Sequence, residues 1–142
     1  MLKQIPPIIP PELMKIMMEM GHGDELLLCD GNYPRNGSPE RCVRMDGHGV
    51  PEILDAILRF LPLDAYVEHP ALLMATGPEE PEPGVWRTYR EIGARYEPDG
   101  LREAQLERFD FYERGRKAYA CVATGETALY ANIILKKGVV KL

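Results

Sequence analysis

Short apolar runs alternate with amphipathic segments along this chain, and that alternation limits its fold more than any other feature. Glu25–Cys29 and Ala71–Ala75 have the length and composition of strands that are buried on both faces. Pro11–Met20 carries apolar side chains three and four residues apart, which predicts an amphipathic helix that begins at Pro11. Alternating strand and helix patterns are typical of α/β proteins. We therefore expect an α/β fold, a single three-layer domain with a largely parallel sheet.

The same patterns predict the other elements. Gly21 is the expected left-handed end of the first helix, and Pro62 limits the second. Gln105–Arg108 is expected to form the end of a strand. Further strands are expected over 41–45, 105–108, 119–124 and 132–135, and further helices over 50–61, 85–95 and 109–117.

Length and charge exclude several classes of protein. The 142 residues fit one domain, 1–142, and a hydrophobic fraction of 45% is enough for a sizeable core. Seventeen Lys and Arg against 22 Asp and Glu give a net charge of −5, which argues against nucleic acid and against a membrane surface as partners. We expect no signal peptide, and no apolar run approaches the roughly 20 residues of a membrane span. Three widely spaced cysteines indicate free thiols and a cytoplasmic protein.

Two residues near the first strand are candidates for chemistry. Asp30 directly follows that strand, and open α/β sheets bind ligands at the carboxyl ends of their strands. His22 lies in the preceding loop between Gly21 and Gly23, which leave the imidazole unhindered. Histidine suits proton transfer near neutral pH, and Asp24 and Asp30 are close enough in sequence to orient the ring. The alternative is a solvated loop histidine.

The C-terminal stretch adds two polar candidates. Tyr130 and Asn132 stand at the entrance to an apolar strand, and their hydroxyl and carboxamide groups suit hydrogen bonding to a polyol. The alternative is that Tyr130 is an edge aromatic residue and Asn132 a turn residue.

Six motifs in order along the whole chain carry a family resemblance. They are Met1–Lys3, Pro11–Leu13, Glu19–Glu25, Phe111–Arg114, Thr124–Glu126 and Tyr130–Val139. The Gly-His-Gly-Asp and Tyr-Ala-Asn-Ile-Ile-Leu blocks within them are specific when they occur together. Together the motifs resemble the family of L-fucose mutarotases and D-ribose pyranases. The resemblance implies a compact α/β domain, assembled into a ring-shaped decamer with sugar sites near subunit boundaries.

The resemblance also implies an activity and a set of site residues. The expected reaction interconverts the α and β anomers of L-fucose by acid/base ring opening, with pyranase activity on D-ribose as a further expectation. It requires no cofactor and no metal, and the partner is a monosaccharide. Arg108 occupies the place where the fucose branch carries arginine, and Tyr119 is a looser aromatic match. The implied catalytic residue is His22, and the implied substrate-binding residues are Asp30, Arg108, Tyr119, Tyr130 and Asn132.

Two other classes of function are open at this stage. A non-catalytic sugar-binding accessory protein of a transport system would keep the same polar residues as a binding site. A metal-dependent hydrolase would use His22, His48, Asp24, Asp30 and Asp46, although their spacing fits no recognised ligand pattern.

Overall fold

The computed structural model describes residues 1–142 as four α-helices, one short 3-10 helix and six strands. Apart from the 3-10 helix, each element lies where the sequence patterns predict it, with ends that differ by at most three residues. No helix combines the length and apolar character that crossing a membrane requires. In chain order the elements are α1 (Pro11–Glu19), β1 (Glu25–Cys29), η1 (Arg35–Gly37), β2 (Cys42–Met45), α2 (Val50–Leu58), β3 (Ala71–Met74), α3 (Gly84–Tyr96), β4 (Glu103–Leu106), α4 (Arg108–Arg116), β5 (Ala120–Thr124) and β6 (Ile133–Lys136).

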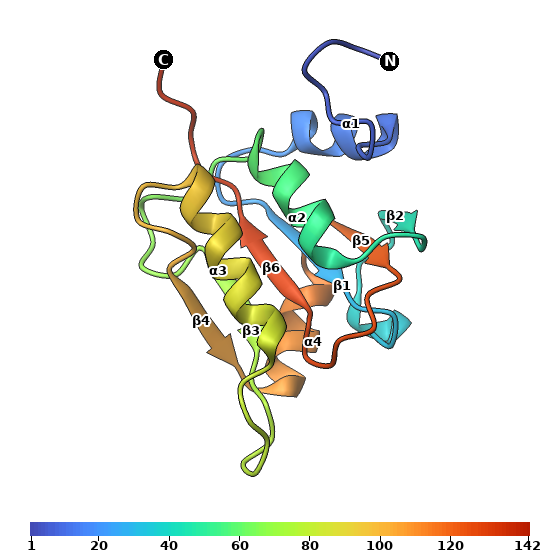
Figure 1. Cartoon of the computed structure of the whole chain (residues 1–142), viewed down its shortest axis with the longest axis vertical. Coiled ribbons are helices and arrows are strands. Elements are labelled where there is room, and N and C mark those ends of the chain that lie inside the picture. Colours follow the sequence, from blue (N-terminus) through green and yellow to red (C-terminus); the bar gives the residue numbers. More distant parts are fainter.

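The six strands form one sheet in the order β2-β5-β1-β6-β3-β4. Strands β1 to β5 all run in the same direction, and β6 runs antiparallel to both of its neighbours, β1 and β3. We call the edge at which β1 to β5 end the carboxyl edge, and the opposite one the amino edge. The carboxyl edge is at the bottom of Figure 1 and both chain termini are at the top. Because β6 is reversed, the residues just before it lie at the carboxyl edge, between the ends of β1 and β3.

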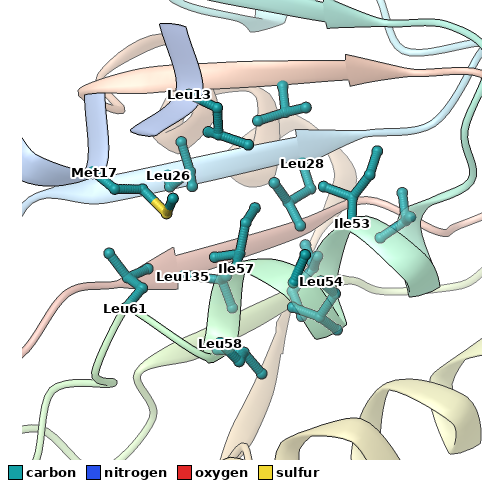
Figure 2. Packing of buried hydrophobic residues seen from close by; sticks show 14 of the residues in the cluster. Leu13, Met17, Leu26, Leu28, Ile53, Leu54, Ile57, Leu58, Leu61 and Leu135 are labelled. Atoms are coloured by element: carbon teal, nitrogen blue, oxygen red, sulfur yellow. The ribbon is translucent and has the colours of Figure 1, made fainter. Parts of the chain in front are cut away.

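Helices cover both faces of the sheet, so the predicted three-layer α/β class with a largely parallel sheet is confirmed. Helices α2 and α3 lie in front of the sheet in Figure 1, and α4 lies behind it. Side chains of β1 alternate between the two layers: Leu26 and Leu28 belong to the larger core with α1, α2 and α3, whereas Leu27 packs with Phe111 of α4. Figure 2 shows Leu26 and Leu28 facing Ile57 of α2. Burial on both faces explains the unbroken apolar run of β1.

The predicted left-handed end of the first helix is wrong. Helix α1 passes directly into extended backbone at Met20, with φ −63° and ψ 136°, so Gly21 is not the left-handed residue. Met20 is buried, and the extended backbone lets its side chain join the core without a glycine turn. The left-handed residue of this loop is Gly23, with φ 88°. The loop that carries His22 therefore turns after the histidine.

Candidate active site

Four of the predicted site residues lie at the carboxyl edge of the sheet. Asp30 directly follows β1, and Tyr130 and Asn132 precede the reversed strand β6 beside it. Arg108 begins α4, shortly after the end of β4. The antiparallel direction of β6 thus brings residues about a hundred positions apart in sequence to the edge where α/β sheets bind ligands.

Asp30 and Asn132 are joined directly. The backbone N–H of Asp30 donates a hydrogen bond of 2.7 Å to Oδ1 of Asn132, and both residues are buried. The Asp30 carboxylate accepts a hydrogen bond of 2.9 Å from the backbone N–H of Asn32. Burial raises the pKa of the Asp30 carboxyl, against the opposing effect of these hydrogen bonds. The result is a fixed acceptor with little solvent around it, which suits a sugar hydroxyl.

Tyr130 has a strained backbone that helix α3 supports. Its φ of 54° lies in the left-handed region, which is uncommon for a residue with a side chain. The indole Nε1–H of Trp86 donates to the Tyr130 carbonyl at 2.8 Å, and the Tyr89 hydroxyl donates to the Ala131 carbonyl at 2.7 Å. Because Trp86 and Tyr89 are both fully buried, they fix the segment that presents Tyr130 and Asn132. The Glu80 carboxylate beside the Tyr130 hydroxyl raises its pKa, so the hydroxyl stays protonated.

Arg108 is an exposed cation at this edge, and the prediction that it ends a strand is wrong. Strand β4 ends at Leu106, and the Glu107 carboxylate accepts hydrogen bonds from the backbone N–H groups of Phe109 and Asp110. Because Glu107 is the N-cap, α4 begins at the next residue, Arg108. The guanidinium carbon lies 4.6 Å from the centre of the Phe109 ring, and the group forms no ion pair within the chain. Its donors are therefore available to a ligand.

His22 lies at the opposite, amino edge of the sheet. Strand β1 has five residues, and a strand rises about 3.3 Å per residue, so Asp30 is roughly 17 Å away along the strand. The expectation that Asp24 or Asp30 orients the imidazole is wrong, because Asp24 instead accepts a hydrogen bond of 2.7 Å from the Gly21 N–H. The ring nitrogen Nε2 of His22 bonds to Oδ1 of Asp64 at 3.0 Å.

Tyr119 also lies at the amino edge, directly before β5. Its hydroxyl donates to Glu19 at 3.0 Å, and the Arg41 guanidinium lies 4.0 Å from the centre of its ring. Within one chain, His22 and Tyr119 are therefore separated from the four residues at the carboxyl edge.

Asp64 is the residue of this region that the sequence does not indicate. It lies 42 positions from its partner His22, in the loop between α2 and β3, and no motif surrounds it.

No group of three or more His, Cys, Asp or Glu side chains is arranged to hold a metal ion. The residues considered for a metal-dependent hydrolase have separate partners. His22 pairs with Asp64, Nδ1 of His48 lies 3.1 Å from Glu52, and Asp46 forms an ion pair of 2.9 Å with Arg44.

Ligands of open α/β sheets bind outside the carboxyl ends of the strands, which is where Asp30, Tyr130 and Asn132 lie. The chain belongs to the RbsD / FucU transport protein family, whose model matches residues 3–140. The crystal structure of the fucose mutarotase from Streptococcus pneumoniae in complex with L-fucose is 51% identical and superimposes with a TM-score of 0.93, covering 99% of this chain and 100% of that one. The FucU structure from Bifidobacterium longum is 48% identical with a TM-score of 0.92, covering 96% and 100%. Human fucose mutarotase is 48% identical over 150 aligned positions, covering 99% of this chain and 96% of the human protein.

Proposed function

We propose that this protein is an L-fucose mutarotase, which interconverts the α and β anomers of the sugar by opening and reclosing its ring. The observation that carries the proposal is the similarity, over nearly the whole chain, to a fucose mutarotase crystallised with L-fucose. The polar groups at the carboxyl edge support it, because a buried carboxylate, a phenol and an unpaired guanidinium together match the hydroxyl groups of a monosaccharide. We propose that Asp30, Arg108, Tyr130 and Asn132 hold those hydroxyl groups.

We propose His22 as the catalytic acid and base. Ring opening needs a proton removed from the anomeric hydroxyl and a proton delivered to the ring oxygen. A positioned histidine performs both steps near neutral pH, and such catalysis contributes about 10²–10⁴-fold. The reaction changes no oxidation state, so the proposal requires no cofactor.

One chain alone does not bring the proposed catalytic and binding residues together. His22 is roughly 17 Å from Asp30 along β1, which is farther than one monosaccharide spans. We therefore propose a homo-oligomer in which the amino edge of one copy, with His22 and Tyr119, meets the carboxyl edge of another. The sequence resemblance supports this arrangement, because it implies a ring-shaped decamer with sugar sites near subunit boundaries.

The activity is tested with a single crystalline anomer of L-fucose. Its equilibration is followed by polarimetry or by NMR of the anomeric proton, alongside D-ribose and other aldoses. The wild-type protein should accelerate the exchange of L-fucose, and His22→Ala should lose about 10²–10⁴-fold of the catalysed rate. His48→Ala is the matched control, because the half-exposed ring of that histidine bonds only to Glu52. Saturable binding of L-fucose without faster exchange would instead identify a sugar-binding accessory protein.

The shared site is tested by complementation. His22→Ala and Arg108→Ala, each of which should be inactive alone, are coexpressed with different affinity tags, and the mixed oligomer is purified through both tags. A shared site predicts recovered activity, because some boundaries then combine an intact His22 with an intact Arg108. A mixed oligomer as inactive as its parents would exclude a site shared between copies.

We also propose that the protein acts in the cytoplasm. The support is chemical: Cys29, Cys42 and Cys121 are all free thiols, as is usual in a reducing compartment.

A further inference from the structure

Asp64 is a buried carboxylate that contacts the proposed catalytic histidine. Its side chain is 4% exposed, whereas that of His22 is 47% exposed. One oxygen, Oδ1, accepts hydrogen bonds from the His22 ring nitrogen Nε2 and from the backbone N–H of Tyr66, both at 3.0 Å. The imidazole is therefore held through Nε2 by a buried carboxylate, and the rest of the ring is partly open to solvent.

The loop that carries Asp64 is fixed on several sides. The Asp64 N–H donates to the Lys136 carbonyl at 3.0 Å, which ties the loop to the end of β6. The guanidinium of Arg102 donates to the carbonyls of Asp64 and Val67, at 2.7 and 2.8 Å. The Leu63 N–H immediately before it donates to the Glu97 carboxylate at 2.8 Å. These contacts hold the backbone of Asp64 in place without any contribution from His22.

The charge of Asp64 determines which ring nitrogen of His22 carries hydrogen. Burial raises the pKa of the Asp64 carboxyl, but the Tyr66 N–H and the His22 ring outweigh burial and hold that pKa below its usual value. An ionised carboxylate only accepts hydrogen bonds, so Nε2 of His22 must be the donor. Nδ1 then carries the lone pair, and it makes no hydrogen bond within the chain.

We propose that Asp64 is the positioning residue for His22: it holds the imidazole with hydrogen on Nε2 and keeps Nδ1 as the base that meets the sugar. This inference rests on the proposed function. The proton of the anomeric hydroxyl moves to Nδ1, and the electron pair it leaves forms the C1 carbonyl. The bond between C1 and the ring oxygen breaks, and the ring oxygen takes a proton, which His22 returns. Asp64 stabilises the imidazolium during this transfer, as a carboxylate does for the histidine of a serine protease.

The first test determines which ring nitrogen of His22 carries hydrogen in the wild-type protein without sugar. Nitrogen-15 NMR distinguishes the two tautomers, and the three histidines are assigned with His48→Ala and His69→Ala. The proposal requires hydrogen on Nε2 of neutral His22, and a loss of this preference in Asp64→Ala, which has no acceptor at that place. Neutral wild-type His22 with its hydrogen mainly on Nδ1 would overturn the proposal, whether or not any variant folds.

The second test measures anomer exchange of L-fucose by Asp64→Asn. We expect kcat to fall at least about tenfold, up to the 10²–10⁴-fold of the whole acid–base contribution, with KM within about twofold. Asp24→Asn is the control, because Asp24 lies in the same loop as His22 and its carboxylate bonds only to the Gly21 N–H. A folded Asp64→Asn variant with wild-type kcat would refute the positioning role. A wild-type protein that accelerates no aldose would refute the proposed function, and the NMR result would still decide whether Asp64 holds the ring.

Discussion

Tyr89→Phe removes one oxygen atom from the support behind the candidate sugar site. The Tyr89 hydroxyl donates to the Ala131 carbonyl at 2.7 Å, and both residues have no measurable exposure. Burial raises the pKa of Tyr89, so the hydroxyl is protonated and donates at every pH of interest. The variant keeps the aromatic ring and its packing, and it loses only the hydrogen bond.

The expected effect follows from the buried carbonyl that is left without its donor. An unsatisfied buried group costs about 1–3 kcal/mol in the free energy of unfolding, and the small size of the change favours the lower half of that range. In a domain of this size each kcal/mol corresponds to a Tm lower by about 2–4 °C. Because Ala131 lies between Tyr130 and Asn132, the loss should also loosen the sugar site. If all of about 1.4 kcal/mol reached binding, KM for L-fucose would rise about tenfold.

The measurements are urea unfolding at fixed protein concentration, and the KM of L-fucose anomer exchange. Tyr96→Phe is the matched control on the same helix, because its hydroxyl donates to Asp55 at 2.8 Å, away from the proposed site. Tyr96→Phe should leave KM unchanged. The reasoning is refuted if Tyr89→Phe matches wild type in both unfolding and KM, since the Ala131 carbonyl would then need no donor.

Two further predictions concern stability. A Cβ at Gly115 would lie 2.5 Å from the Gly37 carbonyl oxygen and 2.4 Å from the Tyr33 hydroxyl, so Gly115→Ala should lower the free energy of unfolding by about 1–3 kcal/mol; Gly84→Ala, where no atom lies within 4 Å, should not lower it. Equal unfolding midpoints in urea for the two variants would contradict this packing argument. Because the pKa of Asp30 is raised in the folded state, the protonated carboxyl stabilises the fold at low pH, and this stability is lost as the pH rises through the folded-state pKa. Asp30→Asn has no such loss, so its stability relative to wild type should increase from pH 3 to pH 7. A wild-type-minus-variant difference in urea unfolding that does not change with pH would exclude a raised pKa.

The type and order of the elements follow from local chemistry. Glu25–Cys29 is apolar at almost every position, which predicts a strand buried on both faces, and the structure places helices on both sides of it. Pro11 begins α1 as expected. Asp30 reaches the carboxyl edge simply because it follows that strand. Periodicity and chain order are therefore enough to predict β1, the start of α1 and the place of Asp30.

The exact start of α4 depends on a contact that periodicity does not record. The Glu107 side chain caps the helix, and this moves Arg108 from the end of a strand to the first turn of a helix. The usual start signals do not indicate this cap, since they place Ser, Thr, Asp or Asn at the N-cap and the capping residue here is a glutamate. The prediction of a left-handed helix end at Gly21 is wrong because of a tertiary contact. Met20 is buried, and extended backbone at this residue places its side chain in the core without a glycine turn.

The sequence by itself determined an α/β chain with a histidine before the first strand and polar residues around the later ones, because spacing within a helix or strand is a local property. Only the tertiary structure decided that β6 is reversed, which sets Asn132 against Asp30 and leaves His22 at the other edge with Asp64. Strand direction and partners depend on which surfaces are buried together by residues far apart in the chain. No local pattern of apolar and polar residues encodes that choice.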